Sequence, residues 1–141
     1  MFKGGTRLQG IDHIGIAVHS IEKSLPFYTE VLKFTYIKSE TVEKQGVKVA
    51  FIDAHNCKIE LLEPINQHSP VYRFLQKRGE GIHHIALKTD QIQEKIEQLQ
   101  NGGIRMIDTE PRKGANGADI AFLHPSSTFG VLWELCHKKD S

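Results

Sequence analysis

Two histidines and two glutamates recur at matching places in the two halves of this sequence. His13 lies in the run IDHIGIAV, and His84 follows 71 positions later in the run IHHIAL. Glu60 and Glu134, 74 positions apart, each interrupt an apolar run late in its half. Imidazole and carboxylate ligands suit a borderline divalent ion such as Zn, Co, Mn, Ni or Fe(II). Four such ligands would leave two octahedral positions open, so the pattern predicts a catalytic metal site.

The glutamates stand where an isolated charge would be costly. Glu60 lies within KIELL and Glu134 within LWELC. A buried carboxylate without a counter-charge costs several kcal/mol or takes up a proton, and a divalent ion supplies that counter-charge. The alternative is that the four residues are unrelated strand residues at a sheet edge or facing solvent.

The elements that must position these side chains follow from the same repeat. Alternation predicts a strand at 11–18, with His13, Gly15 and Ala17 lining a cavity. In the second half His83 is expected to point away from His84, because neighbouring strand residues face opposite sides. The other histidines are expected at element ends or on the surface: His19, His55, His68, His124 and His137.

Helical patterns follow each of these strands. A stripe predicts a helix over about 21–32, capped by Ser20, with Pro26 kinking it or delaying its start. Its counterpart is capped by Asp90 and stops at Gly102. Further strands are expected at about 34–42, 47–53, 57–63, 82–88, 104–108, 118–123 and 130–136.

Each half therefore reads strand–helix–strand–strand–strand. Residues 1–141 are expected to form one domain of two repeats, about 9–68 and 80–137. A short helix at about 69–79, with Pro70 at its first position, joins them. Sustained βα alternation is absent, so the pattern favours an α+β fold with an antiparallel sheet.

The composition excludes several classes of partner. With 25% charged and 39% hydrophobic residues and a formal net charge of +1, the chain gives no reason to expect nucleic acid or an acidic surface. No apolar run reaches the ~20 residues of a membrane span, and the N-terminus lacks the apolar region of a signal peptide. Two cysteines, Cys57 and Cys136, give no disulfide framework. A cytoplasmic protein without a membrane partner is therefore expected.

The sequence resembles the vicinal oxygen chelate superfamily of glyoxalases, bleomycin-resistance proteins and extradiol dioxygenases. Within it, the strongest likeness is to the methylmalonyl-CoA epimerases, from about residue 9 onward. The likeness is carried by these stretches: IDHIGIAV (11–18), QGV (45–47), IELLEP (59–64), SPV (69–71), RGEGIHHIA (78–86), IAFLHP (120–125) and GVLWEL (130–135).

The resemblance implies two βαβββ modules that form a cupped sheet around a divalent metal ion, and a homodimer. By motif, the ligands fall on His13, Glu60, His84 and Glu134. The implied reaction is a 1,1-proton transfer on the acyl-CoA thioester methylmalonyl-CoA through a metal-stabilised enolate, with Glu134 as one proton-transfer group. A glutamate that serves as base in some relatives is Val49 here, and the direction of nearby Glu43 is open.

Three other functions of this superfamily stay open at this point. Lactoylglutathione lyase shares the ligand set but acts on a glutathione hemithioacetal. Extradiol dioxygenases use two histidines and one glutamate, so a fourth ligand argues against them. A metal-free small-molecule binding module would not need intact ligands in both halves. The native metal and the placement of the site within one chain or between swapped modules also stay open.

Overall fold

The computed structural model describes residues 7–138, and these residues divide into two compact units. Module one is His13–His83, and module two comprises residues 7–12 and 84–138. In chain order the first set of elements is β1 (Ile11–Ala17), α1 (Ile21–Pro26), a π-helical turn η1 (Phe27–Val31), β2 (Thr35–Val42), a 3₁₀ turn η2 (Glu43–Gln45), β3 (Val47–Asp53), β4 (Lys58–Pro64) and α2 (Pro70–Arg78). The second set is β5 (Gly81–Lys88), α3 (Ile92–Asn101), β6 (Arg112–Lys113), η3 (Ala115–Gly117), β7 (Asp119–Phe122), η4 (Pro125–Ser127) and β8 (Trp133–His137).

Each set begins with the predicted order of strand, helix and three strands. In module one the strands are ordered β2-β3-β4-β1, and in module two β5-β8-β7-β6. The expectation of antiparallel pairing holds for β2 with β3, β3 with β4, β6 with β7 and β7 with β8. It is wrong for the first strand of each set, because β1 is parallel to β4 and β5 is parallel to β8. Each sheet is therefore mixed.

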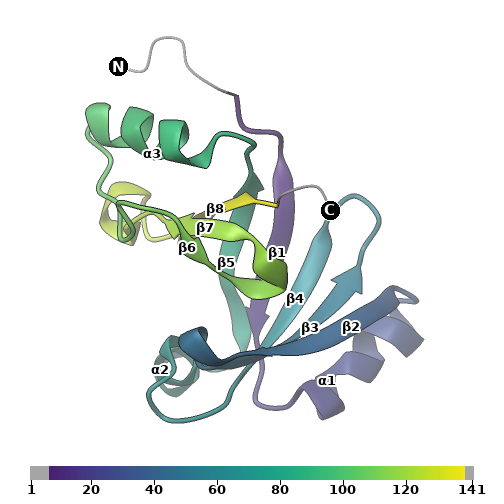
Figure 1. Cartoon of the computed structure of the whole chain (residues 1–141). Helices are drawn as coiled ribbons and strands as arrows, with labels where there is room; N and C mark the ends of the chain where they lie inside the picture. The colour runs from purple at the N-terminus through teal and green to yellow at the C-terminus, as the bar shows by residue number, and fades with distance from the viewer. Residues whose placement is uncertain (1–6, 139–141) are drawn as a thin grey trace. The chain divides into compact units, whose positions relative to one another are not determined.

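One face of each sheet is covered by the helix of the same module (Figure 1). In module one, Ala50, Ile52 and Leu61 pack with Val18 and Ile21 on the α1 side. In module two the corresponding buried cluster is Ile92, Ile96, Met106, Ala121, Leu123 and Leu135, on the α3 side. Because strand residues alternate, the other face of each sheet is left to a different set of side chains.

The first helix differs from its prediction at Pro26. The chain is α-helical over Ile21–Pro26 and continues as the π-turn Phe27–Val31, in which Leu32 N donates to Phe27 O at 3.0 Å. Pro26 has no N–H to donate, so the helical ladder loses a hydrogen bond at this point. The predicted Ser20 cap is confirmed, since its side chain accepts a hydrogen bond from Lys23 N.

Two predictions in the second half are wrong in detail. The helix is capped at Gln91 rather than at Asp90, and Thr89 Oγ1 accepts the Gln91 N–H at 3.2 Å. The strand expected at 104–108 is reduced to a single bridge between Met106 and Leu123. The Asp108 side chain explains this, because its Oδ2 takes the Phe122 N–H at 2.8 Å and so replaces a backbone partner.

The helix that follows β4 matches its prediction. Ser69 caps it by accepting a hydrogen bond from Val71 N, Pro70 is its first residue and it ends at Gly79. Gly46, at φ +66°, allows close packing here, since a Cβ would lie 3.1 Å from Ser69 Cβ. Among residues 7–138, none of the helices has the length and apolar character to cross a membrane.

Candidate metal and substrate site

Module one brings together His13 and Glu60. Both residues are buried, with 3% and 4% of their surface exposed, and His13 Nδ1 lies 3.2 Å from Glu60 Oε2. Strand register explains the meeting, because Glu60 on β4 is paired with Gly15 on β1. His13 lies two residues before Gly15 and therefore shares its face, and the absence of a side chain at Gly15 leaves room for the imidazole.

Module two repeats this arrangement with His84 and Glu134. His84 Nε2 lies 3.1 Å from Glu134 Oε1, and both side chains are buried. Glu134 on β8 is paired with Ala86 on β5, and His84 lies two residues before Ala86. A small residue therefore stands beside the glutamate in both modules, and the four predicted ligands form two matching His–Glu pairs.

The donor set of each pair fits a divalent metal ion. Zinc binds imidazole nitrogen and carboxylate oxygen at about 2.0–2.2 Å, so two ligands at right angles on one ion lie about 3.0 Å apart. The observed N···O separations of 3.2 and 3.1 Å are close to that value. Burial excludes competing water, and an ion would neutralise each carboxylate.

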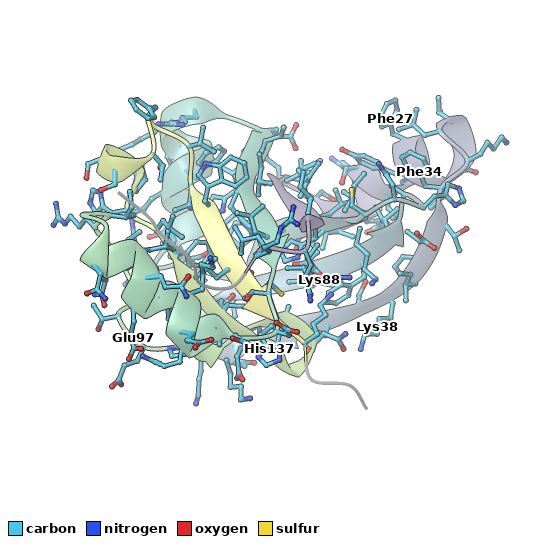
Figure 2. All side chains as sticks on the ribbon, turned by 90° about the horizontal axis from the view of Figure 1, so that it is seen from above. Phe27, Phe34, Lys38, Lys88, Glu97 and His137 are labelled. Atoms are coloured by element: carbon cyan, nitrogen blue, oxygen red, sulfur yellow. The ribbon has the colours of Figure 1, made fainter. Side chains whose placement is uncertain are left out.

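A phenylalanine and a cation accompany each glutamate on its face of the sheet. In module one Phe51 is paired with Glu60, and the Lys38 ammonium lies 5.6 Å from the centre of the Phe51 ring. Figure 2 shows Lys38 on the side of this sheet away from Phe27, a residue of η1, and from Phe34, which packs against the helix-side cluster.

In module two, Phe122 is paired with Glu134 and meets the His84 ring edge-to-face at 5.5 Å. The Arg112 guanidinium lies 5.5 Å from the Phe122 ring, and Asp108 Oδ1 accepts a hydrogen bond from Arg112 Nε at 2.9 Å. Sequence reasoning assigned no role to Phe51 or Phe122. The offset of 71 between them, the same as between the histidines, was the available signal.

The residues set aside as non-ligands have other contacts. His83 is half-buried against Phe74, with ring centres 5.1 Å apart. Burial, with a smaller contribution from Arg78, lowers the pKa of His83 to about 4, so this imidazole is neutral at pH 7. Glu63 Oε1 accepts the Ile21 N–H at 2.7 Å and so holds the start of α1.

His124 lies at an element end, as expected, where it caps η4. His124 Nδ1 accepts the Ser126 N–H at 3.0 Å at the start of η4. Val49 on β3 is buried, with 1% of its surface exposed. Glu43 on η2 is exposed. Among residues 7–138, Cys57 and Cys136 are not joined in a disulfide.

The sequence matches a family model over residues 12–122, most of its length. That model describes the glyoxalase/bleomycin resistance protein/dioxygenase superfamily. The chain belongs to this superfamily. The α+β fold predicted from the repeat is confirmed as the glyoxalase-like fold of this superfamily, with mixed rather than purely antiparallel sheets.

Relatives within the glyoxalase superfamily include epimerases. The chain is 37% identical to the mitochondrial methylmalonyl-CoA epimerase of Homo sapiens over 126 residues, which cover 89% of this chain and 72% of the human protein. An uncharacterised protein of Bacillus subtilis is 48% identical over 92% of each chain.

A solved structure also resembles this chain closely. It is a variant of the Streptomyces coelicolor methylmalonyl-CoA epimerase in complex with 2-nitronate-propionyl-CoA, with a TM-score of 0.89 and 37% identity. The match covers 95% of this chain and 100% of the Streptomyces chain.

Proposed function

We propose that this protein is a metal-dependent epimerase of methylmalonyl-CoA, and that the two His–Glu pairs hold one divalent ion. The observation that carries the proposal is the buried pair repeated in each module of a chain 37% identical to a methylmalonyl-CoA epimerase. A homodimer and a cytoplasmic location, expected from the sequence, belong to the same proposal.

The ligands would be His13 and Glu60 from module one and His84 and Glu134 from module two. A bound divalent ion would supply Lewis-acid stabilisation of the negative charge that develops on the thioester oxygen when the α-proton leaves. Zn, Co, Mn, Ni and Fe(II) all accept this mixture of imidazole and carboxylate. In each module the phenylalanine beside the glutamate would limit access of water to that glutamate and so strengthen electrostatic interactions there.

Glu134 is proposed as one of the two proton-transfer groups. Epimerisation needs one group that removes the α-proton and another that returns a proton on the opposite face of the carbon. Lys38 and Arg112 lie on the glutamate-bearing faces, and Arg112 is ion-paired with Asp108. They would attract the carboxylate and phosphate groups of an acyl-CoA substrate.

The test is incubation of the purified, metal-loaded protein with a single epimer of methylmalonyl-CoA in D₂O. We expect conversion to the mixture of epimers with one deuterium on the α-carbon, measured by mass spectrometry and chiral separation. A parallel reaction with the hemithioacetal of methylglyoxal and glutathione tests the lyase alternative. Isomerisation of the hemithioacetal, together with no exchange of the α-proton of methylmalonyl-CoA, would favour a lyase. Binding of either compound without turnover would favour a binding module, and both results would contradict the proposed epimerase.

A further inference from the structure

The residues on the Glu60 face of module one follow from strand register. In antiparallel pairs, directly opposed residues share a face, and in each strand alternate residues do so. Glu60 is paired with Phe51, and Phe51 with Lys38. Along these strands the residues on this face include Lys38, Glu40 and Val42 on β2, Val47, Val49, Phe51 and Asp53 on β3, and Lys58, Glu60, Leu62 and Pro64 on β4.

This face of module one carries three carboxylates, on Glu40, Asp53 and Glu60. Glu60 forms the pair with His13. Asp53 ends β3, and its Oδ1 accepts the His55 N–H at 2.8 Å, so it belongs to the turn that follows. Glu40 lies well inside β2, a strand that ends at Val42.

The surroundings of Glu40 suit a group that acts on a substrate held at Glu60. Glu40 is half-buried and is paired with Val49, and Val49 is paired with Leu62, the next residue after Glu60 on the same face. Two strand spacings separate β2 from β4, so the backbones at Glu40 and Glu60 lie about 10–12 Å apart. The side chain between them is the buried Val49, which has no competing polar group.

We propose that Glu40 is the second proton-transfer residue, an inference that rests on the proposed epimerase function. The Glu40 carboxylate takes the α-proton as the C–H bond breaks, and the electron pair of that bond passes into the enolate. The other proton-transfer group, Glu134, gives a proton to the opposite face of the carbon, and the electron pair returns to form the new C–H bond. Glu40 then releases its proton to water while Glu134 takes one up, and the reverse reaction exchanges the two roles.

The decisive variant is Glu40→Gln, which removes the basic carboxylate and keeps its shape. We expect kcat for epimerisation to fall about 100-fold, the lower end of the usual contribution of a general base, with metal content unchanged. In D₂O, Glu134 should still exchange the α-proton of the epimer whose α-proton points toward it. The configuration of that α-carbon should stay unchanged. Exchange from the other epimer should be lost. A group with a purely structural role would slow exchange from both epimers alike.

The matched control is Glu43→Gln, which neutralises an exposed carboxylate on η2, three residues away, and should leave kcat unchanged. If Glu40→Gln does not fold by circular dichroism, Glu40→Asp replaces it, with an expected tenfold fall in kcat and the same one-epimer asymmetry. A fall of less than tenfold in Glu40→Gln, or equal loss of exchange from both epimers, would overturn the role of Glu40. If the unmodified protein itself neither exchanges nor epimerises, the proposed function fails, and the role of Glu40 fails with it.

Discussion

Replacing His84 by alanine is expected to abolish metal retention while leaving the protein folded. His84 Nε2 lies 3.1 Å from Glu134 Oε1, and loss of the imidazole removes one of four proposed ligands and leaves Glu134 without this partner. Metal affinity should fall at least 100-fold. The rate of epimerisation should fall to that of protein from which the metal has been removed with EDTA. Elemental analysis after gel filtration measures the retained metal, and circular dichroism measures the fold.

His83→Ala is the matched control for this variant. His83 is the preceding residue on β5, packs against Phe74 and is not a proposed ligand. The His83→Ala variant should lose some stability but keep its metal, because the lost contact with Phe74 lies away from the His–Glu pair. If His84→Ala retains as much metal as the unmodified protein, the proposed ligand set is wrong.

Glu134→Gln is expected to lower epimerisation at least 1,000-fold even at saturating metal. The change removes a negatively charged ligand and a base at once, and general acid–base catalysis alone contributes roughly 10²–10⁴-fold. The rate of α-proton exchange from each epimer, measured over a series of metal concentrations, separates the two losses. Added metal restores the part of the rate that was lost through weak metal binding. It does not restore the part lost with the carboxylate base.

Glu60→Gln provides the comparison, because Glu60 is the matching glutamate of module one and has no proposed proton-transfer role. Its amide oxygen can still coordinate a metal, so this variant should regain most activity as metal is added. Glu97→Gln, an exposed change on α3, serves as the inert control. Equal and unrescued losses in Glu134→Gln and Glu60→Gln would contradict the assignment of proton transfer to Glu134.

The repeat predicted the pairing of histidine with glutamate in each module because both residues interrupt apolar strands at nearly constant offsets. It did not predict strand direction, since alternation in β1 is the same whether its neighbour runs parallel or antiparallel. The strand at 104–108 failed for a related reason. The apolar pattern there is real, but Asp108 competes for the Phe122 N–H, and a local side-chain contact of this kind is invisible to periodicity.

The sequence could not predict that Glu40 lies on the Glu60 face, and the reason is geometric. Between Tyr36 and Lys38 the pairing of β2 with β3 shifts by one residue. A one-residue slip exchanges the two faces of a strand, so the side on which Glu40 lies depends on that irregularity. Only the register places Glu40 on the face that carries Glu60, and Glu43 lies on η2, outside this strand pairing.

Metal stoichiometry tied to activity tests the central claim most directly. Protein stripped with EDTA would be titrated with Co²⁺, with bound ion and α-proton exchange of methylmalonyl-CoA in D₂O followed in the same samples. If the two His–Glu pairs share one ion, exchange should be absent in the stripped protein and reach its maximum at one equivalent per chain. Exchange that is unaffected by EDTA, or a maximum at two equivalents per chain, would contradict a single shared ion.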